Sequence, residues 1–172
     1  MSLRSYRRAR QSWHVGALTL LIGCNSSVVA TDPPKEMVLA PITSPVTLLS
    51  GAFRFSVTSA QPSGGAPQIT YHVTNVSTVA ANLTVQCYVD VRLYSHGSPS
   101  ALVFSQFEEN GVCPMEPTVI VLQAGRDTTL NYRIVAELLF RRPRVAGTYR
   151  FVGTVPGVFP ETEVSAGEVT LR

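Results

Sequence analysis

The sequence predicts an all-β fold, a sandwich of about eight or nine short antiparallel strands that follows an export signal and a proline-rich tether. Three observations support this. Residues 82–94 alternate strictly between apolar and polar side chains, which is the period of a strand with one buried face. Only 15% of the residues are charged, while valine, threonine, glycine and proline are frequent, a composition that favours strands and turns over helices. Glycine- and proline-containing turns separate several further alternating runs.

The alternating stretch 82–94 is expected at the centre of the sandwich. Its inward residues would be Leu83, Val85, Cys87, Val89, Val91 and Leu93. As one strand it would extend over roughly 40 Å, whereas most strands have about five or six residues. A bulge or a change of sheet is therefore expected near Cys87 and Tyr88.

The remaining strands are expected where shorter alternating runs lie between turns. These runs are residues 51–58, 68–74, 101–104, 119–122, 128–136, 147–155 and 167–171, the last of them at a sheet edge. Gly125 lies in the turn 123–127 at the position that most needs a positive φ. Residues 135–140 are ambiguous and could form one short helical turn.

The N-terminus is predicted to be a signal peptide that comprises residues 1–23. Four arginines in the first ten residues precede the short apolar stretch 15–22. A helix of that stretch would rise about 12 Å, too little for a bilayer core of ~30 Å. Leu21-Ile22-Gly23-Cys24 resembles the lipobox of bacterial lipoproteins. The alternative is an ordinary signal peptide with an incidental cysteine.

The lipobox resemblance implies cleavage before Cys24 and a diacylglycerol on its thiol, hence a bacterial envelope protein anchored to a membrane. Asn25 in place of Asp favours the outer membrane, with the domain on its periplasmic or surface face. Residues 24–47 contain four prolines and are expected to form a tether of up to ~60 Å. Residues 48–172 would form the folded domain.

Removing the signal peptide also removes four arginines and leaves ten basic residues against eleven acidic ones. The processed domain therefore lacks the clustered positive charge of a nucleic-acid-binding protein. Arg141, Arg142 and Arg144 form the one later basic cluster, and we interpret it as a solvated loop.

Once Cys24 is lipidated, Cys87 and Cys113 remain as an even pair in an oxidising compartment, and a disulfide between them is the simplest interpretation. The enclosed loop of about 26 residues would contribute roughly 3.5 kcal/mol to stability. A metal site or a reactive thiol is the alternative, but no Cys-x-x-Cys or neighbouring histidine has ligand spacing.

The number of strands indicates a sandwich of immunoglobulin-like type, and Gly147-Thr148-Tyr149 is typical of a tyrosine corner. The sequence also resembles the family of the BsuPI intracellular proteinase inhibitor over residues 52–155. The resemblance is carried by Tyr71-x-Val73-x-Asn75-x-Ser77, by Leu122-x-x-Gly125 and by Gly147-x-Tyr149. It implies the fold, while an exported chain departs from an intracellular inhibitor and no inhibitory residue is carried over.

No catalytic, cofactor or metal-binding motif is present in the sequence. His72 should point outward from its strand and His96 lies in a turn, so neither is expected to act as a base or ligand. Residues 108–111 lack the alternating ligand spacing of a calcium loop. We therefore expect no enzyme, no cofactor and no metal.

Outward aromatic residues are the remaining functional signal. The candidate binding face consists of Tyr88, Tyr94, Phe104 and Phe107, although such residues also commonly cover the second side of a central strand. The leading hypothesis is a lipid-anchored envelope protein that binds an envelope protein or component without catalysis. The alternatives are a proteinase inhibitor acting through residues 108–117, held by Cys113, and a purely structural envelope lipoprotein.

Overall fold

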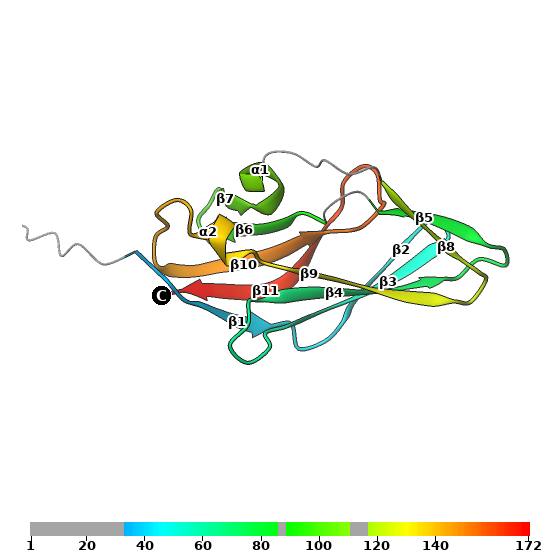
Figure 1. Ribbon diagram of the computed structural model, residues 1–172, viewed down its shortest axis with the longest axis horizontal. Helices are drawn as coiled ribbons and strands as arrows, with labels where there is room; N and C mark the ends of the chain where they lie inside the picture. The colour runs from blue at the N-terminus through cyan, green and yellow to red at the C-terminus, as the bar shows by residue number, and fades with distance from the viewer. Residues whose placement is uncertain (1–32, 86–88, 111–116) are drawn as a thin grey trace, which may run out of the picture. The chain divides into compact units, whose positions relative to one another are not determined.

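The computed structural model describes residues 33–85, 89–110 and 117–172, and they form an all-β fold, as predicted (Figure 1). Two short helices accompany the strands. In chain order the elements are β1 (Met37–Pro41), β2 (Val46–Ser50), β3 (Phe53–Ala60), β4 (Gln68–Asn75), β5 (Ala81–Val85), β6 (Val91–Ser95), β7 (Leu102–Ser105), α1 (Gln106–Asn110), β8 (Thr118–Leu122), β9 (Asp127–Arg133), α2 (Ala136–Leu139), β10 (Gly147–Thr154) and β11 (Glu163–Leu171).

The strands form three antiparallel sheets. Five strands lie in the order β1-β11-β10-β6-β7, four in the order β2-β3-β4-β9, and β5 pairs with β8. A buried hydrogen bond joins the two larger sheets. The Tyr71 hydroxyl of β4 donates to the Thr154 carbonyl of β10 at 2.9 Å. Burial raises the pKa of this phenol, with a further contribution from Tyr132, so Tyr71 remains a neutral donor.

The core consists of the residues that the alternation predicted to point inward. Phe55 and Val57 on β3 and Tyr71 and Val73 on β4 are fully buried, whereas Arg54, which precedes Phe55 on β3, is exposed. The period of two therefore determines which side of each strand packs into the sandwich.

The predicted change of sheet within residues 82–94 is confirmed. β5 pairs with β8 in the two-stranded sheet, whereas β6 pairs with β10 and β7 in the five-stranded sheet. Cys87 and Tyr88 lie outside the described residues. The inward residues on both sides of this gap, Leu83 and Val89, are buried.

The predicted tether, residues 24–47, is wrong from Met37 onward, because β1 lies within it and β2 begins in it at Val46. Both are edge strands, where proline is tolerated because one side of the strand needs no backbone hydrogen bond. Pro41 ends β1.

The presence of β1 also corrects the predicted last strand. β11 begins at Glu163 rather than 167, and it lies between β1 and β10 instead of at an edge.

The turns and helices agree in part with the sequence. The short helical turn expected within residues 135–140 is α2, and Gly125 has a φ of 70°. The Tyr149 hydroxyl donates to the Val145 carbonyl at 2.6 Å, the hydrogen bond expected of a tyrosine corner. Helix α1 was not predicted.

Among the described residues, no helix has the length and apolarity needed to cross a membrane.

Asn75, at the end of β4, joins two turns, residues 76–80 and the turn that contains Gly125. Its side-chain amide donates to the carbonyls of Val79 and Leu122, both at 2.8 Å, and its carbonyl oxygen accepts from the backbone and hydroxyl of Ser77. Its own backbone pairs with the turn that contains Gly125. Because Asn75 is completely buried, these partners replace the water that its amide loses on folding.

We expect Asn75→Ala to destabilise the domain by about 2–4 kcal/mol, because the buried hydrogen bond to the Leu122 carbonyl and the part-buried bond to the Val79 carbonyl are lost. Urea unfolding of the domain measures the change. Asn131→Ala is the matched control: Asn131 lies on the neighbouring strand and bonds only with exposed Thr70 and Gln68 side chains, so its loss should cost less than about 1 kcal/mol. Equal effects of the two substitutions would contradict the role given to Asn75.

Candidate functional site

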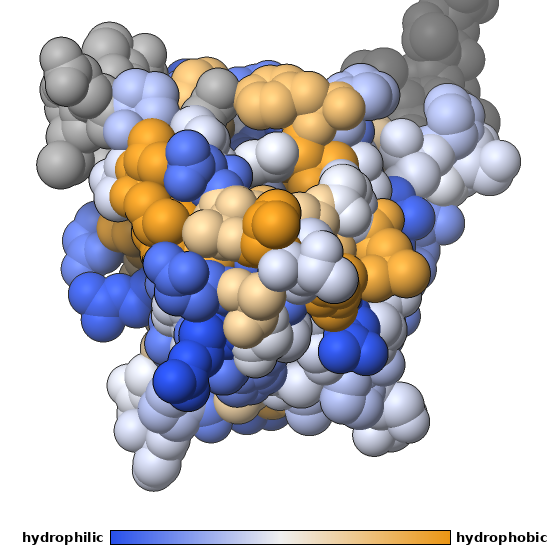
Figure 2. All heavy atoms as spheres, turned by 90° about the vertical axis from the view of Figure 1, so that its right-hand side faces the viewer, coloured by the Kyte–Doolittle hydropathy of each residue, from blue (hydrophilic) through white to orange (hydrophobic). Residues whose placement is uncertain are grey.

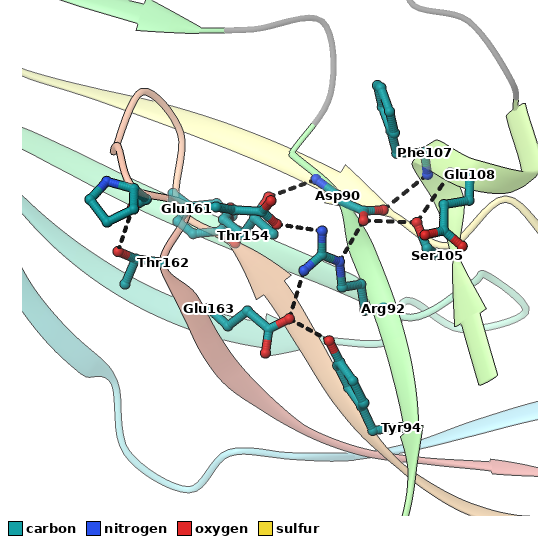
Figure 3. Close-up of polar contacts among 12 residues, drawn as sticks. Asp90, Arg92, Tyr94, Ser105, Phe107, Glu108, Thr154, Glu161, Thr162 and Glu163 are labelled. Atoms are coloured by element: carbon teal, nitrogen blue, oxygen red, sulfur yellow. Dashed lines mark hydrogen bonds and ion pairs between the residues drawn. The ribbon is translucent and has the colours of Figure 1, made fainter. Parts of the chain in front are cut away.

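A buried carboxylate, that of Asp90, lies where the chain passes from β5 toward β6 (Figure 3). The residue is only 5% exposed, although the alternation places it on the outward side. Its Oδ2 accepts from Arg92 Nε at 2.6 Å and from Ser105 Oγ at 2.8 Å, and its Oδ1 accepts from the Phe107 backbone N–H at 2.9 Å. The charge is therefore both paired and hydrogen-bonded, as a buried charge must be.

The backbone of Asp90 is fixed as well. Its N–H donates to Thr154 Oγ1 at 2.8 Å, and its carbonyl accepts from the Thr154 N–H at 3.0 Å. Ser105, which donates to Asp90, accepts in turn from the Glu108 N–H at 3.1 Å. One residue thus connects β6, the end of β10 and the start of α1.

Arg92 extends this network toward β11. Its guanidinium pairs with Glu161, and with Glu163 at 2.7 Å. The Tyr94 hydroxyl also donates to Glu163, and the Arg150 guanidinium lies 5.0 Å from the centre of the Tyr94 ring. We call Asp90, Arg92, Tyr94, Glu161 and Glu163 the Asp90 cluster.

The protonation states within the Asp90 cluster are fixed by these contacts. Burial alone would raise the pKa of Glu163, but hydrogen bonds from Tyr94 and Arg92 outweigh it and the pKa is lowered. Burial and the bond to Glu163 raise the pKa of Tyr94. Burial would lower the pKa of Arg92, yet its bonds to Asp90 and Glu163 raise it. Carboxylate, phenol and guanidinium are thus held in their ordinary states at neutral pH, an arrangement suited to joining strands rather than to proton transfer.

The structure separates the residues of the predicted binding face. Tyr94 is half-buried beneath Arg150, and Phe107 is 48% exposed. The prediction of Phe104 as a surface residue is wrong. Phe104 is 1% exposed and belongs to the core, because its ring points inward from β7. Tyr88 lies outside the described residues, so the face as predicted is reduced to Tyr94 and Phe107.

The basic cluster is only partly a solvated loop. Arg142 is exposed, but the Arg144 side chain is 10% exposed and pairs with Glu109 at 2.7 Å. Arg144 also donates to the carbonyls of Leu139 and Val103 and lies 5.7 Å from the Phe104 ring centre. The interpretation as a solvated loop is therefore wrong for Arg144, which joins α1, β7 and α2.

The two histidines for which no role as a base or ligand is expected, His72 and His96, lie at separate surface positions. His72 Nδ1 lies 3.1 Å from Thr129 Oγ1, and His96 Nε2 lies 3.3 Å from Glu168. In the three ranges that the structure describes, no group of three or more His, Cys, Asp and Glu side chains could hold a metal ion. The predicted lipidation site Cys24 and the predicted disulfide partners Cys87 and Cys113 lie outside these ranges.

Exposed aliphatic side chains gather at one end of the sandwich, near the turns 50–52, 76–80 and 123–126. We call this set the apolar end; it consists of Leu49, Val76, Val79, Val119 and Val121, each between 44% and 70% exposed. Backbone hydrogen bonds join the three turns, from Val76 to Ala52 and from Gly125 to Asn75. Figure 2, which views this side of the molecule, shows several orange apolar groups separated by white and blue polar ones.

Sequence reasoning missed both the Asp90 cluster and the apolar end. Asp90 and Arg92 lie two residues apart on one face of a strand, a spacing that indicates an ion pair. Glu161 and Glu163 lie about 70 residues further along the chain, so the sequence did not indicate that they join this pair. Val119 and Val121 were visible as the outward residues of a short strand, whereas their grouping with Leu49 and Val79 depends on how three turns meet.

No protein-family model, no curated protein and no solved structure matches this chain. The resemblance to the BsuPI inhibitor family therefore stays a prediction. Of the residues on which that resemblance rests, Asn75 accepts from the Ser77 hydroxyl and donates to the Leu122 carbonyl.

We expect acid to weaken the fold through Glu163. Its lowered pKa means that its ionised form stabilises the native state above the unfolded pKa, near 4.5, and that this contribution is lost as the pH falls through the folded pKa. Glu163→Gln should therefore lower the urea midpoint at pH 7 while flattening its decline between about pH 5 and pH 3. Glu137→Gln, at an exposed position on α2, is the control. A Glu163→Gln profile parallel to that of the unchanged protein would refute the assignment.

Proposed function

We propose that this chain is a lipid-anchored, non-catalytic binding protein of the bacterial cell envelope, and that its sandwich recognises an envelope protein through the apolar end. The observation that carries the proposal is the apolar end itself. Five exposed aliphatic side chains, one on β2, two on β8 and two in the turn 76–80, would lose unfavourable contact with water when a partner covers this end.

The composition of the apolar end suits a protein partner. The three turns 50–52, 76–80 and 123–126 contain only one charged residue, Arg126. The centres of protein–protein interfaces are likewise depleted of charge. Peripheral membrane surfaces instead combine apolar side chains with many lysines and arginines, which these turns lack.

The direction from which the chain enters the domain also favours this surface. β3 begins at Phe53, beside Asn75 and the turns of the apolar end, and ends at Ala60. The Gln61 side chain that follows β3 bonds with β1 at Met37 and Leu39. Lys35 and Glu36 donate to Arg172 at this second end. Residues 35–36, where the described chain enters the domain, therefore lie at the end opposite the apolar end.

The absence of catalysis is part of the proposal, and the Asp90 cluster supports it. Its charged groups are fully engaged with one another and connect strands. The inhibitor alternative depends on residues 108–117, of which 111–116 lie outside the described part of the chain, and no described residue favours it.

The partner can be sought with cross-linking in intact envelopes followed by mass spectrometry. We expect the double substitution Val79→Asp and Val121→Asp to abolish a reproducible cross-linked partner, because two carboxylates would have to be desolvated in the interface. Val145→Asp is the matched control, since Val145 is 77% exposed and precedes β10, away from the three turns. An unchanged partner set in the double variant, or binding of the purified domain to protein-free vesicles through this end, would contradict the proposal.

The anchor has a separate test. We expect Cys24→Ser to move the protein from the membrane fraction to the soluble fraction and to prevent incorporation of labelled palmitate, because the substitution removes the thiol that would carry the lipid. Cys87→Ser should leave both properties unchanged. Membrane association that survives Cys24→Ser would exclude lipid anchoring at this residue.

A further inference from the structure

The loop that joins β10 to β11, residues 155–162, is fixed at its base. The Val155 N–H donates to the Thr162 carbonyl at 2.9 Å, which closes the loop. Thr162 also donates from its hydroxyl to the Pro160 carbonyl at 3.2 Å. Arg92 holds the same side of the loop through its ion pair with Glu161.

The opposite side of the loop is fixed by close packing. Gly157 has a left-handed φ of 68°, and a Cβ at this position would lie 2.5 Å from the Thr84 carbonyl oxygen of β5. The backbone therefore approaches β5 more closely than any other residue would allow. Val158, the next residue, is half-buried against the core.

Phe159 is the exception in this well-anchored loop. Its side chain is 71% exposed, although it lies between the packed Val158 and the restrained residues 160–162. Because the surrounding backbone is already fixed, the loop would lose little conformational entropy when a partner covers the ring. Aromatic side chains held in this way are typical of the residues that dominate the affinity of an interface.

Carboxylates follow Phe159 closely along the chain, at Glu161 and Glu163. Both of them pair with the Arg92 guanidinium, as the buried Asp90 does. Glu161 is the most accessible of the three carboxylates, with 52% of its side chain exposed. A partner surface that fits the loop would therefore place a basic group beside the pocket that receives the ring.

We propose that Phe159 is a preformed anchor that inserts into an apolar pocket, bordered by a basic side chain, on the protein partner of this domain. The inference rests on the proposed binding function but on different residues from the apolar end. Gly157 and Arg92 are positioning groups, because they hold the loop, whereas Glu161 both pairs with Arg92 and faces the basic group of the partner.

The test begins with the photoreactive amino acid benzoylphenylalanine at position 159 of the full chain, and at position 145 as a control. The protein cross-linked in intact cells from position 159 is identified, purified and titrated against the full chain. Capture alone does not support the inference. We expect Phe159→Ala to weaken this binary affinity roughly tenfold or more, with an unchanged melting temperature because the ring is exposed.

Further variants separate this inference from the proposed function. Val145→Ala should bind like the unchanged protein. Gly157→Ala should weaken binding, because the added Cβ displaces the loop although the phenylalanine at position 159 is retained. Full affinity of Phe159→Ala, combined with loss of binding in the Val79→Asp and Val121→Asp double variant, would overturn the anchor and leave the proposed function intact. Absence of any specific cross-link from position 159 would also overturn it.

Discussion

The pairing of Asp90 with Arg92 is the constraint on which the connections of β6 to α1 and to the β10–β11 loop depend. Once the chain moves from one sheet to another at this point, the carboxylate is removed from water and must be compensated. Arg92, Ser105 and the Phe107 N–H supply that compensation. The same guanidinium then holds Glu161 and Glu163. A single buried charge thereby places the start of α1 and the β10–β11 loop relative to β6.

Local alternation was sufficient to predict most strands, because burial of one strand face is determined by neighbouring residues. Phe53, Phe55 and Val57 are buried as their spacing indicates. The two N-terminal strands were missed since proline outweighed a weak alternation in the prediction, although edge strands tolerate it. The extent of β11 depended on β1, its partner, and so could not be inferred without β1.

The candidate surfaces were less predictable than the fold for a physical reason. Outward position on a strand does not establish exposure, because neighbouring strands and helices can cover it. Tyr94 alternates outward but lies under Arg150, and Phe104 points inward after the β6–β7 turn. The apolar end and the Phe159 loop arise from contacts between residues that are distant in sequence, such as Gly157 with Thr84. The tertiary structure alone could reveal these contacts.

The hydrogen bonds from Lys35 and Glu36 to Arg172 place the two boundaries of the described domain side by side. A short glycine linker could therefore join residue 172 to residue 35, and the loop at the exposed Gly64 could supply new chain ends. Such a circularly permuted domain would retain every strand pairing. It would also carry a surface attachment point on the β3–β4 loop instead of beside β1, which would reorient the whole sandwich on any support to which it is coupled.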